Sequence, residues 1–261
     1  MADKTSKAGF LSTFFVVLVY LFLYIPTVVL VVFSFNKMPF PAPWTEFTLQ
    51  WYYDLYHASH LWEAFYTSLI VAFLSTFLSI IMGISLMFYA VQGGRVKKLL
   101  ILFYGNLMIP EIVLAIGLLT LFSLCSIPLG LGTLVIAHTV LGLGYVIPLV
   151  YTRFVELDYR LIEASLDLGA SYSQTFFKII LPLLRPSLIA AGLLVFIISF
   201  DDFVLSYFCS GSSVQTLSLY ILSMARSGIS PIINALSTIL LMLSSLLVLI
   251  FCSINARSRI F

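Results

Sequence analysis

Residues 112–152 read IVLAIGLLTLFSLCSIPLGLGTLVIAHTVLGLGYVIPLVYT, a run of 41 residues without Asp, Glu, Lys or Arg. Residues 99–110 extend it toward the N-terminus, interrupted only by Glu111, so the apolar block has 54 residues. An α-helix rises about 1.5 Å per residue, so the block reaches about 80 Å, enough to cross a bilayer core of about 30 Å twice. The segment 126–133 contains Pro and Gly and supplies a turn between the crossings. The sequence therefore predicts a helical integral membrane protein.

The composition of the whole chain agrees with a membrane protein. Its 261 residues are 61% hydrophobic and 9% charged, and the mean hydropathy is +1.12. Soluble proteins are about a quarter charged, so a soluble enzyme or a nucleic-acid-binding protein is excluded. The three cysteines lie in apolar surroundings and do not indicate a disulfide scaffold.

Six transmembrane helices are predicted, because each uncharged run of about 20 residues or more can span the bilayer once. The fifth helix is interrupted by Asp201 and Asp202 and is otherwise uncharged. The predicted spans are 10–35, 66–91, 99–124, 132–152, 186–208 and 232–254. The expected fold class is thus all-α, with residues 1–261 forming a single transmembrane domain.

The basic residues predict the orientation of these spans. Six spans place the N-terminus, the loop 92–98, the loop 153–185 and the C-terminus on one side of the membrane. That side receives 11 of the 13 Lys and Arg residues, and the other side receives only Lys37 and Arg226. Cytoplasmic loops are enriched in Lys and Arg, so both termini are expected in the cytoplasm of a multi-pass inner-membrane protein.

The cytoplasmic loop 153–185 has helical spacing in two short pieces. Gly169 is expected to end the first piece as a left-handed cap, Ser171 to cap the second, and Pro182 to close it. The two pieces are too short to span a bilayer and too amphipathic for a simple linker. A segment of this kind can dock in a groove on a soluble partner.

The same loop carries a recognisable motif. It contains Glu163-Ala164-Ser165, then Gly169 after three residues, then Ile179-Ile180-Leu181-Pro182 after nine more. This pattern resembles the cytoplasmic coupling loop of binding-protein-dependent ATP-binding-cassette (ABC) importer permeases. Ser165 is the one departure, since Ala is usual at that position. The resemblance assigns contact with the ATPase to Glu163, Ala164, Ser165, Gly169, Ile179, Leu181 and Pro182.

The resemblance extends along most of the chain, toward the permease subunits of spermidine/putrescine importers. It is carried by further stretches in or beside the first, third, fifth and sixth spans, namely Tyr24–Pro26, Met108–Val113, Ser199–Val204 and Ser230–Leu236. It implies the type I ABC importer permease fold and import of polyamines into the cytoplasm.

The resemblance also implies partners that the chain does not contain. These are a second homologous permease, two ATPase subunits and a periplasmic or extracytoplasmic polyamine-binding protein. The chain has no Gly-Lys dipeptide and hence no usual phosphate-binding loop, so it is not expected to be an enzyme. No cofactor is expected in this chain, and ATP and Mg²⁺ are expected on the partner ATPase.

Three acidic residues, Glu111, Asp201 and Asp202, lie within the predicted spans, and no Lys or Arg lies there with them. Each costs about 2.5–3.5 kcal/mol at the centre of a helix, which indicates a function. Counted along their helices, the three acids fall at similar depth. Carboxylates at one depth suit a polyamine, and aromatic rings can add cation–π contacts. The candidate rings are Phe200, Phe203 and Tyr207, with ordinary helix packing as the alternative.

Two other interpretations of the acids remain open at this point. They can be protonated structural groups hydrogen-bonded across helices, or a proton relay in an ion-coupled secondary carrier. Within the importer class, another cationic or small organic substrate is the alternative cargo.

Outer tryptophans are the remaining candidates for the pathway. Trp44 and Trp51 can lie at its mouth, although an interfacial aromatic belt is the ordinary interpretation. His138, inside the fourth span, is interpreted as a hydrogen-bonded packing residue. Gly142 and Gly144 are expected to permit close helix packing. No metal site is expected, because His57 and His60 have no further ligand nearby.

Overall fold

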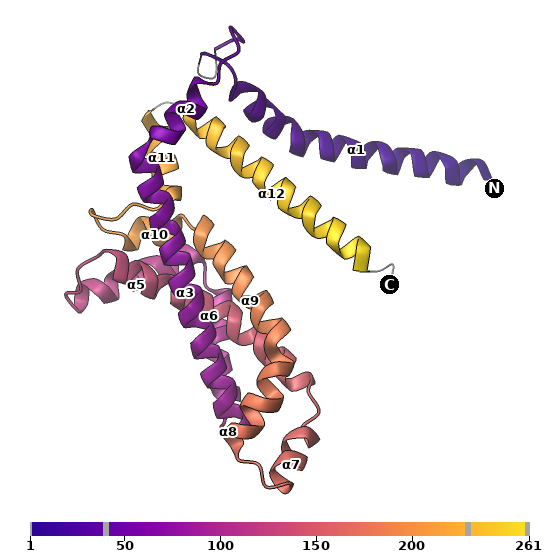
Figure 1. Ribbon diagram of the computed structural model, residues 1–261, viewed down its shortest axis with the longest axis vertical. Helices are drawn as coiled ribbons and strands as arrows, with labels where there is room; N and C mark the ends of the chain where they lie inside the picture. Colours follow the sequence, from indigo (N-terminus) through magenta and orange to yellow (C-terminus); the bar gives the residue numbers. More distant parts are fainter. Residues whose placement is uncertain (1, 39–41, 228–230, 259–261) are drawn as a thin grey trace. The chain divides into compact units, whose positions relative to one another are not determined.

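The computed structural model describes residues 2–38, 42–227 and 231–258, and most of these residues are in helices (Figure 1). Within them, β structure is limited to one isolated bridge between Asn36 and Phe47. The chain forms two compact units, residues 1–59 with 221–261 and residues 60–220, and each is described by itself.

The first unit contains α1 (Ala2–Phe33), α2 (Gln50–His57) and α12 (Pro231–Ser258). Both α1 and α2 contact α12. Thr13–Phe33 of α1 is apolar and long enough to cross a membrane, and its side chains are not buried within the protein, as expected for a helix that faces lipid. The first predicted span falls on α1. The sixth falls on α12, whose side chains are described only as far as residue 246, and stays a prediction.

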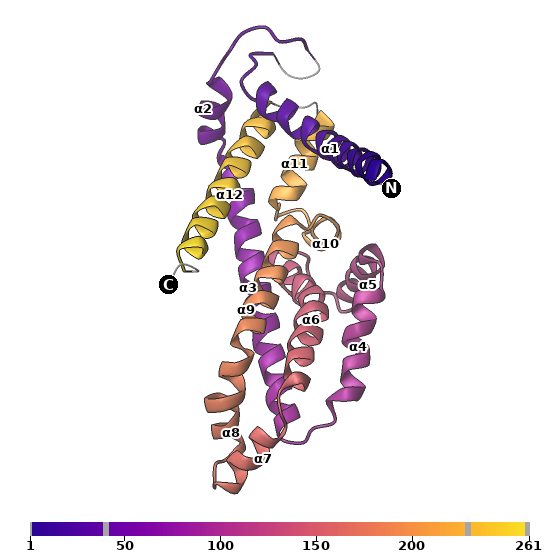
Figure 2. The same ribbon diagram turned by 90° about the vertical axis from the view of Figure 1, so that its right-hand side faces the viewer.

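The second unit is built around α3 (Ser59–Val91), α6 (Leu131–Glu156) and α9 (Leu181–Asp201), which lie beside one another (Figures 1 and 2). α6 is the most buried of the three. Gly142 of α6 has no room for a side chain, since a Cβ there would lie 2.5 Å from Ser79 Oγ of α3 and 2.8 Å from Val195 Cγ1 of α9. At Gly144 a Cβ would lie 2.7 Å from the amide nitrogen of Asn106. The prediction that these glycines permit close packing is confirmed.

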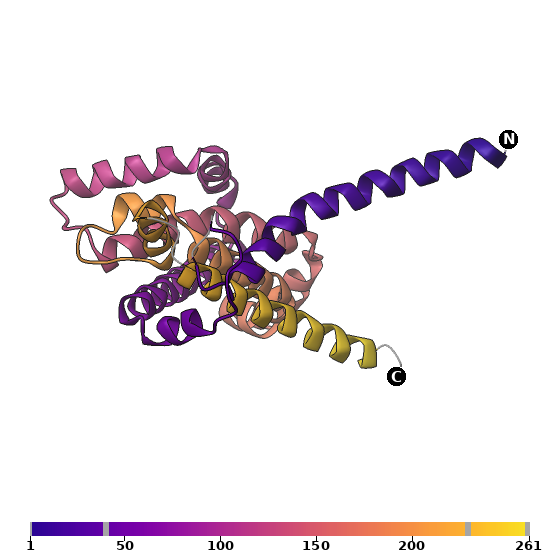
Figure 3. The ribbon, with the colours of Figure 1, turned by 90° about the horizontal axis from the view of Figure 1, so that it is seen from above.

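The third predicted span, 99–124, is wrong as a single straight helix. It consists of α4 (Val96–Met108) and α5 (Glu111–Leu124), which meet at an angle of 112°. Figure 2 shows α4 beside α6, and Figure 3 shows α4 nearly end-on with α5 lying across the view. The break has a local cause: Pro110 donates no backbone hydrogen bond and forces Ile109 into an extended conformation, with ψ 129°. The Pro110 carbonyl then accepts from Val113 N (2.9 Å) and begins α5.

The fifth predicted span, 186–208, also has different limits. The helix starts earlier and ends earlier, because α8 (Tyr172–Thr175) continues through a π-helical turn, Phe176–Ile180, into α9. The expectation that Pro182 closes the short helix is therefore wrong: Pro182 follows the π-helical turn by two residues, and the helix continues through it. α9 stops at Asp201, and α10 (Val204–Cys209) is a separate short helix.

The remaining helices are α7 (Arg160–Asp167) and α11 (Leu217–Ser227). In the described part of the chain, four helices are long and apolar enough to cross a membrane, and five if α4 and α5 form one broken span. The protein is thus a helical membrane protein with several spans. The total of six, and the side on which the termini lie, stay predictions.

Candidate functional site

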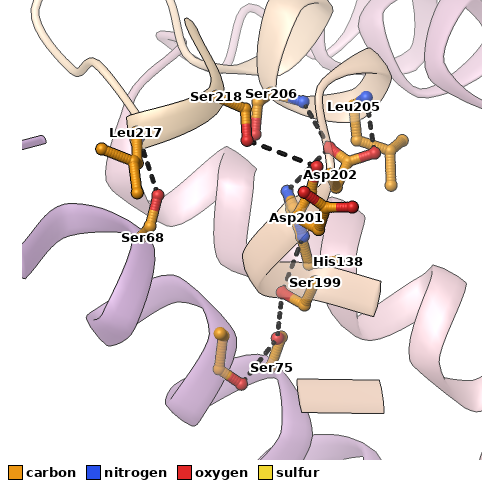
Figure 4. Close-up of polar contacts among 11 residues, drawn as sticks. Ser68, Ser75, His138, Ser199, Asp201, Asp202, Leu205, Ser206, Leu217 and Ser218 are labelled. Carbon is orange, nitrogen blue, oxygen red and sulfur yellow. Dashed lines mark hydrogen bonds and ion pairs between the residues drawn. The ribbon is translucent and has the colours of Figure 1, made fainter. Parts of the chain in front are cut away.

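The corner between α9 and α10 is organised by Asp202. α9 ends at Asp201, and Asp202 is extended (φ −63°, ψ 131°). Its carboxylate accepts hydrogen bonds from the backbone N–H of Ser206 (2.9 Å) and, at 3.4 Å, of Leu205 (Figure 4). These are N–H groups of the first turn of α10, which has no partners within its own helix for them. The Asp202 side chain is 1% exposed, so it serves as a buried helix cap.

His138 of α6 lies against this cap. Its Nε2 is 3.5 Å from Asp202 Oδ2, with a side chain fully shielded from solvent. The contact is electrostatic, since Nε2 makes no hydrogen bond within the described residues. On the other side of the ring, Nδ1 is 2.8 Å from Ser199 Oγ of α9, and Ser199 Oγ is 3.1 Å from Ser75 Oγ of α3 (Figure 4). A chain of buried polar groups therefore joins α3, α9, α6 and the corner.

Glu111 approaches Asp202 from α5. It is the first residue of α5, directly after the break at Pro110, and its carboxyl group is near enough to that of Asp202 for the two to interact electrostatically. Glu111 also lines a cavity of about 180 Å³ together with Asn106 and Tyr145. The broken helix therefore brings two of the acids predicted at similar depth near each other.

Asp201 differs from Asp202 in its exposure and in its hydrogen bonds. Its side chain is exposed, and its carboxylate has no hydrogen bond or ion pair with the residues that the structure describes. Its backbone carbonyl accepts from Ser218 Oγ at 3.3 Å (Figure 4). Asp201 is therefore available to a ligand, whereas Asp202 is engaged within the protein.

The aromatic residues predicted to line the pathway differ in their surroundings. Phe200 packs edge-on against Phe65 of α3, with ring centroids 5.8 Å apart, and so contributes to helix packing. Tyr207 is 51% exposed and lies 5.6 Å from the ring of Phe203, next to the corner. Trp44 belongs to the first unit, where its side chain is 49% exposed.

His138 is the site residue that reasoning from the sequence missed. It is hydrogen-bonded and buried, as expected, but its contact with Asp202 was not foreseen. A titratable side chain within an apolar span was the feature of the sequence that could have identified His138 as a site residue.

The loop 153–185 contains two short helices joined by a defined turn. α7 ends in a Schellman motif, in which Gly169 has φ +85° and Ala170 N donates to Ser165 O (3.1 Å). Ser171 caps α8 through a capping box, since Ser171 Oγ accepts from Gln174 N, and Gln174 Oε1 accepts from Ser171 N. The predicted roles of Gly169 and Ser171 are confirmed.

The two helices are anchored to the rest of the second unit. Ile162, Phe176 and Ile180 are buried in a core with residues of α3, α6 and α9, and the ring of Phe88 lies 5.2 Å from that of Phe176. The opposite surface of the pair, which carries Glu163 and Leu168, stays exposed.

That outer surface holds a cavity of about 590 Å³. Its lining includes Leu161, Ala164, Leu168, Gly169, Lys178 and Ile179. Leu168 is 89% exposed, an unusual state for a large apolar side chain outside the bilayer. Of the motif residues, Glu163, Ala164 and Gly169 are exposed, Ser165 is buried, and Ile179, Leu181 and Pro182 are half-buried.

The broken membrane helix, the apolar spans and the docking segment together define a transport permease subunit. Residues 77–258 match the family "binding-protein-dependent transport system inner membrane component", and the chain belongs to this family. It is therefore a multi-pass inner-membrane component of an ABC importer.

Relatives of known name agree with this assignment. The chain is 39% identical over 254 residues to the spermidine/putrescine transport system permease protein PotC of Haemophilus influenzae, covering 96% of this chain and 98% of that one. It is 39% identical over 253 residues to PotC of Escherichia coli K12 (95% and 93%). It is 32% identical over 229 residues to the putrescine transport system permease protein PotI of the same strain (84% and 82%).

Solved structures share the fold at low sequence identity. An inward-facing MetNI methionine ABC transporter matches with a TM-score of 0.60 and 18% identity over 77% of this chain and 98% of that chain. A bacterial ABC transporter that imports the polysaccharide alginate matches with a TM-score of 0.68 and 12% identity over 95% of each chain. The cargoes named for these two structures differ, so the fold alone does not identify a cargo.

Proposed function

We propose that this chain is a permease subunit of an ATP-driven importer that moves polyamines, spermidine and putrescine, into the cytoplasm. The observation that carries the proposal is the 39% identity over nearly the whole length of PotC. The family assignment favours it over an ion-coupled secondary carrier, because that family works with a separate binding protein.

The corner between α9 and α10 supplies chemistry for a polycation. Asp201 presents an exposed carboxylate, and Tyr207 and Phe203 present aromatic faces beside it. Both kinds of group attract ammonium ions. Asp202 and Glu111 interact with each other inside the protein, so they form a supporting pair rather than equal partners of Asp201 in binding.

The proposal includes partners and an energy source. A second, homologous permease completes the pathway, two ATPase subunits bind ATP and Mg²⁺, and an extracytoplasmic binding protein delivers the polyamine. The outer surface of α7 and α8 docks the ATPase, which its exposed Leu168 and adjoining cavity support.

The membrane arrangement that fits this role has six spans and both termini in the cytoplasm, with residues 1–261 serving as one permease domain. The distribution of 11 basic residues against two supports it. This orientation places α7 and α8 on the same side as the ATPase.

Reconstitution tests the proposal. The chain is placed in proteoliposomes with the second permease, the ATPase and the binding protein encoded beside it, and uptake of labelled spermidine is followed. We expect uptake that requires ATP and the binding protein and that unlabelled putrescine inhibits. Uptake by this chain alone without ATP, or uptake that polyamines do not inhibit, would contradict the proposal.

A further inference from the structure

We propose that His138 is a positioning residue: its imidazole holds the Asp202 carboxylate in place and thereby fixes the corner that presents Asp201. The assignment of Asp201 to the substrate rests on the proposed function, but the contact itself and its effect on the corner do not.

The two ring nitrogens of His138 have different partners. Nδ1 lies 2.8 Å from Ser199 Oγ, which in turn lies 3.1 Å from Ser75 Oγ. Nε2 lies 3.5 Å from Asp202 Oδ2. Oδ2 is the same oxygen that accepts from Ser206 N at 2.9 Å, so His138 acts on the very atom that caps α10.

The chemistry of the contacts assigns the hydrogens. A carboxylate oxygen accepts hydrogen bonds, so a lone pair of Nε2 facing it would be repelled. Nε2 therefore carries the hydrogen and Nδ1 is an acceptor. Ser199 then donates to Nδ1 and accepts from Ser75. The Ser75 hydroxyl also donates to Ala72 O of α3 at 3.2 Å, so its single hydrogen is shared between Ala72 O and Ser199 Oγ, and the Nε2 hydrogen faces the carboxylate.

Burial makes the contact matter. As whole residues, His138 is 1% exposed and Asp202 is 7% exposed, so their contact is shielded from bulk water. A buried carboxylate that loses a favourable electrostatic partner is less well stabilised in its position. Without His138, we expect the first turn of α10 to open more often.

Two substitutions of His138 distinguish its contact with Ser199 from its contact with Asp202. The amide nitrogen of Asn reaches about as far as Nδ1 of His, and that of Gln about as far as Nε2. His138→Gln therefore keeps a donor toward Asp202, whereas His138→Asn keeps only the contact with Ser199. A residue that merely fills space would make no such distinction. Ser79→Ala is the matched control, since it removes another buried interhelical hydrogen bond, from Ser79 Oγ to Thr139 O (3.2 Å), beside but outside this path.

The primary measurement does not depend on cargo. Ser206 is fully buried in the first turn of α10, so a Ser206→Cys thiol reports on opening of the corner. The three native cysteines are replaced by Ala, and the modification rate by N-ethylmaleimide is measured in the assembled transporter. We expect His138→Asn to raise the rate about tenfold, and His138→Gln and Ser79→Ala to change it little. Equal rates for the Asn and Gln variants, or faster labelling of the Gln variant, would overturn the proposal.

Polyamine uptake is the second measurement. With Ser206 intact, His138→Asn should raise the KM for uptake about tenfold with a smaller change in maximal rate, while His138→Gln stays near the unmodified protein. If labelling separates Asn from Gln but polyamines are not transported at all, the positioning role stands and the proposed function fails. If uptake is normal in every variant while labelling does not separate them, the positioning role fails and the proposed function stands.

A double-mutant comparison tests whether His138 acts through Asp202. Asp202→Asn keeps an acceptor for Ser206 N, and its amide can turn an N–H toward His138. In the Asp202→Asn background, we expect His138→Asn to change the labelling rate less than it does in the unmodified protein. The effects of the two substitutions on the labelling rate are then not additive. Strict additivity would overturn the proposal.

Discussion

The hydroxyl of Ser165 lies 2.9 Å from that of Thr175, and this bond joins α7 to α8 across the turn at Gly169. Ser165 is the one position where the loop departs from the motif of ABC importer permeases. The Thr175 hydroxyl donates to Ser171 O at 3.1 Å, which leaves Ser165 as the donor to Thr175. The departure thus has a structural role: a side-chain bond that Ala could not make.

Replacing Ser165 by Ala should therefore lower stability slightly and leave coupling intact. The lost bond is worth about 1 kcal/mol in free energy of unfolding, and Thr175 keeps its bond to Ser171. Thermal unfolding of the purified transporter measures the loss. Ser85→Ala is the control, because the exposed Ser85 hydroxyl bonds only within its own helix, to Ile81 O. If Ser165→Ala instead abolished ATP-driven uptake, Ser165 would have a direct role in contact with the ATPase.

Gly169→Ala should uncouple ATP hydrolysis from uptake. Space is open around Gly169, but its φ of +85° is costly for any other residue, by about 1–2 kcal/mol, so the turn between α7 and α8 shifts. The ratio of polyamine transported to ATP hydrolysed measures the effect.

Gly105→Ala is the matched control for that experiment. Gly105 also has open space around it but lies inside α4, where Ala is favoured over Gly by roughly 1 kcal/mol. We expect normal coupling in this variant. Normal coupling in Gly169→Ala as well would show that the shape of this turn is unimportant for docking.

Asp201→Asn should reduce polyamine uptake strongly, because the exposed carboxylate loses its charge while the fold of the corner, which depends on Asp202, is unchanged. Asp201→Glu keeps the charge and should retain most of the uptake. Initial rates at low spermidine concentration, normalised to assembled transporter, give the comparison. Glu111→Gln should reduce uptake less than Asp201→Asn, since Glu111 acts through Asp202. Full uptake by Asp201→Asn would remove Asp201 from the substrate pathway.

Gly142→Ala should destabilise the second unit by about 1–3 kcal/mol, because a Cβ would overlap Ser79 of α3 and Val195 of α9. Gly132→Ala, near the start of α6, meets no atom within 4 Å and serves as the control. Thermal unfolding in detergent distinguishes them. Equal midpoints would mean that α6 can move away from its neighbours without cost.

The sequence located most of the membrane helices because long apolar runs have few alternatives. It failed at two breaks, after Met108 and after Asp201. At the first, Pro110 is the only local signal, and a proline kink and a 112° break look alike in sequence. At the second, the acid pair was interpreted through charge alone, whereas Asp202 ends one helix by capping the next.

The turn between α7 and α8 was predictable in detail because its signals are local. Gly169 and Ser171 act within a few residues of themselves, so spacing was enough. The contact between His138 and Asp202 joins residues 64 positions apart, and no pattern in a single sequence reports such a pair. The same holds for Glu111, whose approach to Asp202 depends on the bend before α5.

The helix from Tyr172 to Asp201 has no gap, since α8, the π-helical turn and α9 follow one another directly. Its 30 residues extend about 45 Å at the usual rise per residue. One end lies in the segment proposed to contact the ATPase, and the other carries the acid proposed to contact the cargo. A displacement of Tyr172 is therefore transmitted to Asp201 through the backbone of one continuous helix. Movement driven by the nucleotide and release of the cargo would be coupled through this helix.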